Sequence, residues 1–121
     1  MFKVGAEYTR DEIYAQLGGS KQAYLPTVSG HVVAICVTPK LNPRAPNVVL
    51  CGVGPIIAAS GTSLSNQLLP VPVFIKQGVK RWQYRGDFKV AASYSTGPKF
   101  STLVSGSGRA PSDVSLAIEM V

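Results

Sequence analysis

The segment His31–Thr38 constrains the fold more than any other part of the chain. It is a continuous run of apolar and mostly β-branched residues, bounded by Gly30 and Pro39. Runs of this length and composition favour a β-strand. This is the strongest strand prediction in the sequence.

A second strand is predicted for residues 48–53, after a connector that Pro43 and Pro46 stiffen. If the two strands pair antiparallel across this connector, Cys36 lies opposite Cys51 and both thiols share one face. In a reducing compartment we interpret these thiols as two small buried apolar groups.

Two helices are predicted from the residues at their ends. Thr9 and Glu12 have the spacing of a capping box, and Gly18-Gly19 follows as a stop signal. Pro55 suits the first position of a second helix, where its missing amide costs nothing. We expect this second helix to face the core through four apolar residues: Ile56, Ile57, Leu64 and Leu68.

Two further strands are predicted at residues 71–77 and 81–92. The second of these alternates strictly, so its side chains divide between two faces. One face holds Trp82, Tyr84, Phe88 and Val90, and the other holds Arg81, Gln83, Arg85 and Lys89. Gly86 inside this run predicts a bulge or bend.

Residues 93–121 begin with a stretch rich in Ser, Gly and Thr. A short strand is expected at Phe100–Val104, and residues 111–121 indicate either a closing helix or a frayed tail. We expect residues 1–92 to form the core of a single globular β-rich domain, with residues 93–121 part of the same domain. The order of elements favours an α+β fold, a small half-open β-barrel with short helices packed at its ends.

Composition excludes several classes of protein. The chain has 121 residues, of which 45% are hydrophobic and 15% are charged, so it is one domain and not a disordered tail. No apolar run reaches the ~18 residues of a transmembrane helix, and the N-terminus lacks the apolar region of a signal peptide. Because it has only two cysteines, we expect a cytoplasmic protein.

Sites for cofactors, metals and catalysis find little support in the sequence. Gly52-Val53-Gly54 lacks the third glycine of a dinucleotide-binding turn. One histidine and two cysteines without metal-ligand spacing argue against zinc. No cofactor, metal ligand or catalytic residue is therefore predicted. A small hydrolase or nuclease using His31 as its base is kept as an alternative, because catalytic partners meet in space rather than in sequence.

The basic residues carry more information. Twelve lysines and arginines outnumber six acidic residues, for a net charge of +6. Five of the bases fall close together: Lys76, Lys80, Arg81, Arg85 and Lys89. Arg81, Arg85 and Lys89 share one strand face, at roughly 6–7 Å for every second residue, which is close to the phosphate repeat of a nucleic acid strand. The pattern fits either a nucleic-acid contact or a solvated sheet face.

A series of short motifs resembles a poorly characterised bacterial domain that occurs alone or beside HNH nuclease and restriction-type partners. The motifs run from about Tyr8 to Val90: Leu17-Gly18-Gly19, Tyr24-Leu25-Pro26, Gly30-x-Val32-Val33, Asn42-Pro43-x-Ala45-Pro46, Gly52-x-Gly54-Pro55, Pro72-Val73-Phe74-x-Lys76 and Trp82-x-Tyr84-x-Gly86-Asp87. The last motif also resembles a barrel-closing strand of PUA-like domains, a superfamily that includes the SRA and EVE readers of modified bases. The resemblance implies a PUA-like half-open barrel that binds nucleic acid and is not an enzyme.

We therefore expect a nucleic-acid-binding module, for DNA rather than RNA, that reads a modified or flipped base. The five clustered bases would position the backbone. Gln22, Tyr24 and His31 would line the base pocket, because a flipped base needs stacking and edge hydrogen bonds. The first alternative is a protein-interaction or assembly module, or a homodimer, formed through the apolar residues 116–121. No membrane partner is expected.

Overall fold

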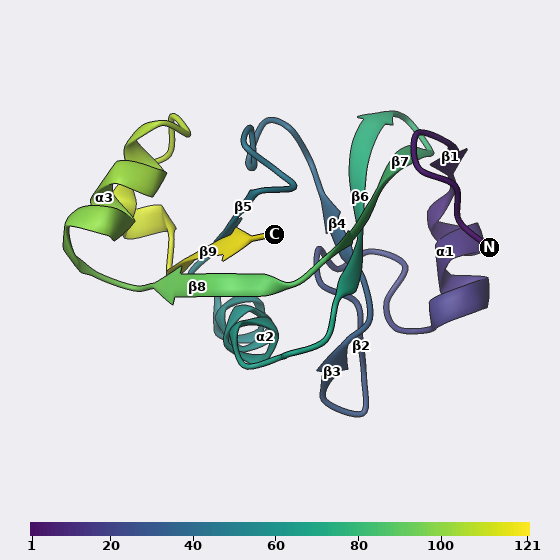
Figure 1. Ribbon diagram of the computed structural model, residues 1–121, viewed down its shortest axis with the longest axis horizontal. Coiled ribbons are helices and arrows are strands. Elements are labelled where there is room, and N and C mark those ends of the chain that lie inside the picture. Colours follow the sequence, from purple (N-terminus) through teal and green to yellow (C-terminus); the bar gives the residue numbers. More distant parts are fainter.

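The computed structural model describes residues 1–121. Its helices are α1 (Arg10–Leu17), α2 (Pro55–Ser65) and α3 (Gly97–Ser105), with a short 3-10 helix at Pro111–Asp113. Its strands are β1 (Glu7–Tyr8), β2 (Thr27–Val28), β3 (His31–Val32), β4 (Ile35–Val37), β5 (Val48–Cys51), β6 (Val71–Gly78), β7 (Arg81–Phe88), β8 (Val90–Tyr94) and β9 (Leu116–Met120). Figure 1 shows α1 and α3 at opposite ends of the molecule.

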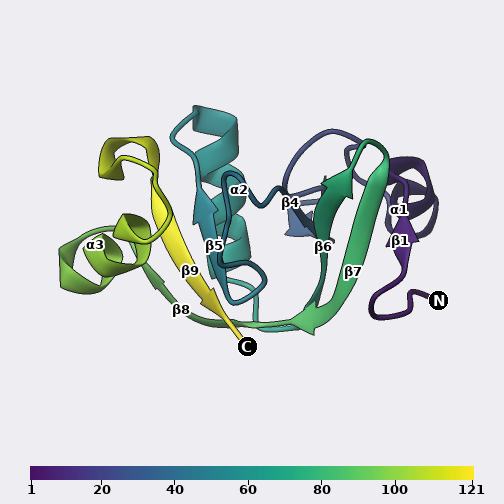
Figure 2. The ribbon, with the colours of Figure 1, turned by 90° about the horizontal axis from the view of Figure 1, so that it is seen from above.

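Two sheets form the frame of the molecule. One has the strand order β1-β7-β6-β4 and the other β5-β9-β8, while β2 and β3 form a separate hairpin. β7 continues into β8 through Lys89, whose amide and carbonyl both bond to Val121 at 2.9 Å. This continuous stretch joins the sheets as the two sides of an open U (Figure 2). The α+β class is therefore confirmed, and the sheets do not close into a barrel.

The core divides into three apolar clusters. The largest lies between the two sheets and includes residues of β4, β5, β6, β9 and α2. A second lies between α3 and the β5-β9-β8 sheet, and a third lies between α1 and one face of β6 and β7. Every residue of β4 and β5 is buried, which accounts for their continuous apolar sequences.

The predicted pairing of the first two strands is wrong. The run that starts at His31 is interrupted after Val32, and β4 pairs in parallel with β6, whereas β5 pairs with β9. Cys36 lies in the cluster near α1 and Cys51 in the cluster between the sheets. Both thiols are free and buried, as expected, but their strands belong to different sheets and the thiols do not face each other.

The bulge predicted in the fourth strand is present at Gly86. This glycine has a φ of +111°, and the register between β6 and β7 shifts beside it. The strand turns at the bulge, so its apolar side chains divide between two clusters. Trp82 and Tyr84 pack near α1, whereas Phe88 and Val90 pack against the core between the sheets. The expectation that these four residues share one face is wrong.

The first helix is confirmed, including its cap. Thr9 Oγ1 accepts a hydrogen bond from the Glu12 amide at 3.1 Å, and Glu12 Oε1 accepts one from the Thr9 amide at 2.8 Å. Gly18 ends the helix with a φ of +79°. No helix in the structure is both long and apolar enough to cross a membrane.

The second helix begins at Pro55 as predicted, and of its four expected core residues Leu64 is buried whereas the other three are exposed. Ile56 and Leu68 are 83% and 87% exposed, and the buried residues of α2 are Gly61 and Leu64. A Cβ atom at Gly61 would lie 2.7 Å from Cys51 Sγ. Glycine is a poor helix former, but its lack of a side chain at position 61 allows α2 to approach β5 closely.

The C-terminal segment departs most from expectation. Residues 97–105 form α3 rather than a strand, with a proline in the first turn. Residues 116–120 form β9, which is neither a helix nor a tail, because it pairs with β5 on one side and with β8 on the other. Ala117, Ile118 and Met120 are buried. This segment is therefore part of the core and does not offer the exposed docking surface that the interaction-module alternative requires.

Candidate functional site

A cavity of about 380 Å³ lies where the two sheets meet the first turns of α2. Five of its lining residues are buried: Cys36, Val37, Asn42, Leu50 and Trp82. Five are exposed and surround the opening: Gln22, Ala23, Leu41, Ile56 and Ile57. The others are Arg10, Tyr24, Thr38, Gly52, Ser60 and Arg109. An apolar cavity of this size with a few polar groups is typical of a ligand site.

Tyr24 contributes an aromatic ring that α2 holds in place. Its hydroxyl donates a hydrogen bond to the Ile57 carbonyl at 2.6 Å. Burial raises the pKa of Tyr24 far above its ordinary value, and the neighbouring Cys51 thiol raises this pKa further. Burial also raises the pKa of Cys51 to about 11. Both groups are therefore neutral at physiological pH, although the nearby Arg109 guanidinium acts in the opposite direction and lowers both pKa values.

Arg109 reaches the cavity from the segment that follows α3. Its Nη1 donates to the carbonyls of Leu41 at 3.2 Å and Leu50 at 3.3 Å, and its Nη2 donates to the carbonyl of Asp113 at 3.3 Å. None of the ion pairs in the chain involves this guanidinium. Its positive charge is therefore fixed in position by neutral groups and is not neutralised by a carboxylate.

Asn42 is buried although its side chain is a polar amide, and it also lines the cavity. Its Oδ1 accepts a hydrogen bond from the Leu50 amide at 2.7 Å, which ties the connector to β5. Its Nδ2 donates to no group of the protein. This nitrogen is not among the buried unpartnered atoms, so it is open to water and is a candidate donor to a ligand in the cavity.

A more open depression, which we call the basic groove, adjoins the cavity and has a volume of about 640 Å³. It shares Arg10, Gln22 and Trp82 with the cavity. The rest of its lining consists of Thr9, Asp11, Lys21, Lys76, Val79 and Lys80. Its basic side chains outnumber its single carboxylate, so the groove is electropositive.

Arg10 and Trp82 form the boundary between cavity and groove. Arg10 Nη2 donates to the carbonyls of Ser20 at 2.9 Å and Ala23 at 2.8 Å. The Arg10 guanidinium carbon lies 5.1 Å from the centre of the Trp82 ring, and Lys76 Nζ lies 5.6 Å from it. Arg10 Nε is buried and has no hydrogen-bond partner. Two cations therefore flank one aromatic ring at the boundary.

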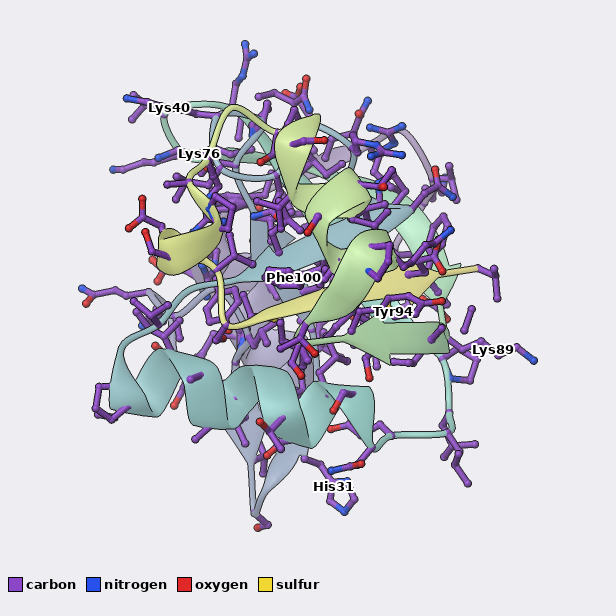
Figure 3. The ribbon with its side chains drawn as sticks, turned by 90° about the vertical axis from the view of Figure 1, so that its left-hand side faces the viewer. His31, Lys40, Lys76, Lys89, Tyr94 and Phe100 are labelled. Atoms are coloured by element: carbon purple, nitrogen blue, oxygen red, sulfur yellow. The ribbon has the colours of Figure 1, made fainter.

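The structure brings together two of the three residues expected at a base pocket. Gln22 lines both the cavity and the groove, and Tyr24 lines the cavity. His31 lies on the β2–β3 hairpin, is exposed and lines neither. Figure 3 shows its ring at the end of the molecule away from Lys76. The His31 ring has no hydrogen-bond partner, and no three His, Cys, Asp or Glu residues are grouped to hold a metal ion.

Two of the five clustered bases line the basic groove. Lys76 and Lys80 line the basic groove, whereas Arg81, Arg85 and Lys89 do not. Arg81 Nε instead lies 3.5 Å from Glu7 Oε1. Figure 3 shows Lys76 and Lys89 at well-separated places on the molecule.

Four residues that define the site are not predicted as site residues from the sequence: Arg10, Asn42, Trp82 and Arg109. The sequence predicts Trp82 as a core residue, and it is buried while also bordering the cavity. Arg109 stands alone in a segment of small residues. An isolated charge in such a segment is the one feature that suggests a role, and nothing in the sequence places it beside Asn42.

Residues 7–100 match the family described as "Domain of unknown function (DUF6697)". The chain belongs to this family. Among solved structures, the modification-dependent TagI restriction endonuclease has a similar fold, with a TM-score of 0.61 and 15% sequence identity. The similarity covers 99% of this family member and 49% of the endonuclease chain, so the present chain spans about half the length of that protein. No curated protein matches the chain significantly.

Proposed function

We propose that the chain is a DNA-binding module that takes a modified or flipped base into its cavity. The observation that carries this proposal is that the cavity and the basic groove adjoin and share Arg10, Gln22 and Trp82. A base reader needs a pocket for a planar ring beside a surface for phosphates. The cavity volume lies in the range of small-molecule sites, which is large enough for one base.

In this proposal the groove and the cavity have separate roles. Lys21, Lys76 and Lys80 contact phosphates, and binding gains free energy from the counterions that are released. Tyr24 supplies a ring against which a base packs, and Gln22 supplies hydrogen bonds to the base edge. His31, Arg81, Arg85 and Lys89 lie outside both surfaces and have no part in this proposal.

The fold comparison supports DNA as the partner. The similar solved structure is, by its name, a restriction endonuclease that depends on modification. The proposal takes from this likeness the kind of ligand and assigns no cleavage to the present chain.

A mobility-shift panel tests the proposal. The chain is titrated with duplexes of one sequence that carry cytosine, methylated cytosine, hydroxymethylated cytosine or a phosphorothioate linkage, and with the matching single strands. We expect binding that weakens steeply with added salt and that differs between modified and plain duplexes. Binding to none of these nucleic acids at low salt would overturn the proposal.

A further inference from the structure

The cavity lining has an unusual charge balance. Its sixteen residues include two arginines, Arg10 and Arg109, and not a single aspartate or glutamate. The remaining lining is largely apolar, so little in the cavity balances these charges. A ligand that fills the cavity therefore removes water from two guanidinium groups.

The hydrogen bonds of Arg109 show which of its N–H groups have no protein partner and would lose water when a ligand binds. A guanidinium has five N–H groups, and Arg109 uses Nη1 twice and Nη2 once to bond the carbonyls of Leu41, Leu50 and Asp113. Its Nε and the second N–H of Nη2 donate to no protein group. Asn42 Nδ2 is also without a partner, so the same cavity contains several unused donors.

A side chain at position 52 would partly cover Arg109. A Cβ atom built on Gly52 would lie 3.9 Å from Arg109 Nη2, and 3.2 Å from Ile57 Cγ2. Glycine at this place keeps the guanidinium open toward the cavity. The free donors and the open approach both favour a ligand that supplies hydrogen-bond acceptors.

We infer that the cavity selects a base that carries an anionic or strongly accepting substituent, such as a carboxyl group, over one that carries a methyl group. This inference rests on the proposed function and specifies the ligand of the same site. The ring of such a base packs on Val37, Leu50 and Tyr24, and its substituent accepts hydrogen bonds from Arg109 and Asn42. A methyl group would cover the same guanidinium without offering an acceptor, which is unfavourable.

The test compares three duplexes that differ at one cytosine, which is plain, 5-methylated or 5-carboxylated. Equilibrium binding at constant salt is measured for the parent and for Arg109→Met. We expect the parent to bind the carboxylated duplex about 10-fold or more tighter than the methylated duplex, as one charge-assisted hydrogen bond implies. Arg109→Met should lose most of this preference for the carboxylated over the methylated duplex.

Arg44→Met is the matched control, because Arg44 is exposed and lines neither the cavity nor the groove. It should keep the parent's preference. Arg109→Lys keeps the charge but not the planar donor pair, so it should retain part of the preference. Melting temperatures identify any variant that fails to fold.

The outcomes separate this inference from the proposed function. If the parent binds the three duplexes with salt-dependent and equal affinity, the inference is wrong and DNA binding stands. The inference is also wrong if folded Arg109→Met keeps the full carboxyl preference. If the parent binds no duplex, the proposed function itself fails. If Arg109→Met does not fold, the parent's own preference between the carboxylated and the methylated duplex still tests the inference.

Discussion

At the scale of single residues, Tyr24 has one part that stabilises the fold and another part that can contact a ligand. Its hydroxyl is bonded to the Ile57 carbonyl at 2.6 Å, while its ring borders the cavity. The hydroxyl is therefore committed to the protein, and the ring is the part that a ligand meets. The two parts are separable by substitution.

We predict that Tyr24→Ala reduces any preference for a modified base and leaves the salt dependence of binding unchanged, because the ring touches the base and not the phosphates. Tyr24→Phe should keep the preference and lower the free energy of unfolding by about 1 kcal/mol through the lost hydrogen bond. Binding to the modified and plain duplexes measures the first effect, and urea unfolding measures the second. Tyr14→Ala, on the exposed side of α1, is the control. An unchanged preference in folded Tyr24→Ala would place the base elsewhere.

The raised pKa values of the two buried cysteines predict that the stability of the fold depends on pH. Burial raises the pKa of Cys36 to about 12 and that of Cys51 to about 11, against an ordinary thiol pKa of about 8.5. The folded state therefore holds these protons more tightly than the unfolded state. The resulting stability is complete below about pH 8.5 and is lost as pH rises through 11 and 12.

We expect the free energy of unfolding of the parent to fall between pH 8.5 and 10.5, and Cys36→Ala with Cys51→Ala to show a shallower fall. Urea titrations at four or five pH values give the two slopes. At pH 7 the double variant should be modestly less stable, because two buried groups are shortened. Equal slopes in the two proteins would show that the thiols do not contribute. Binding to DNA at pH 7 should survive both changes.

At the scale of elements, the packing of α2 on β5 depends on one glycine. A Cβ atom at Gly61 would meet Cys51 Sγ at 2.7 Å and Cys51 Cβ at 2.9 Å, and the second of these atoms has little freedom to move. Because α2 also supplies Ile57 and Ser60 to the cavity, a shift of this helix changes the shape of the site.

We predict that Gly61→Ala lowers the free energy of unfolding by about 1–3 kcal/mol, as overpacking does, although alanine is the better helix former. Thr62→Ala, at the next and exposed position of the same helix, should change it by less than about 0.5 kcal/mol. Urea unfolding of the two variants and the parent makes the comparison. A Gly61→Ala variant as stable as the parent would mean that α2 does not approach β5 this closely.

The sequence predicts elements better than it predicts their neighbours. The capping box at Thr9, the proline at the start of α2 and the bulge at Gly86 are local signals, and all three are confirmed. The pairing of β4 with β6 and of β5 with β9 joins segments far apart in the chain. Adjacent strands often pair, but here both faces of each strand are buried, so no alternation of polar residues indicated which neighbour each strand has.

The C-terminal third shows the same limit in another form. β9 has the length of a strand or of a short helix, and an apolar run of this length does not distinguish the two. It forms a strand because it lies between β5 and β8, whose edge N–H and C=O groups need hydrogen-bond partners. α3 lies in the preceding stretch that is rich in Ser, Gly and Thr. Its buried residues Phe100, Leu103 and Val104 follow helical spacing.

At the scale of the whole molecule, the candidate site could be predicted only in part. Gln22, Tyr24, Lys76 and Lys80 were expected from their residue types, and they line the cavity or the groove. Arg109 comes from the far end of the chain and meets the connector and β5 only because β9 lies between β5 and β8. Alternation along β7 placed Arg81 and Arg85 together, but the electropositive surface runs across β6, α1 and the turn after β6 instead.

The lysines of the basic groove should set how strongly DNA binding depends on salt. Each phosphate contact that is removed should flatten the dependence of log K on log salt by about 0.9 units for duplex DNA. Lys76→Gln with Lys80→Gln should therefore weaken binding to plain and modified duplexes alike and reduce the slope by about two. Arg85→Gln with Lys89→Gln removes the same charge from exposed residues outside the groove, and the slope should stay near that of the parent. Titrations at four salt concentrations measure both slopes. If the control pair flattens the slope and the groove pair does not, DNA lies along β7 and β8, and the cavity does not face it.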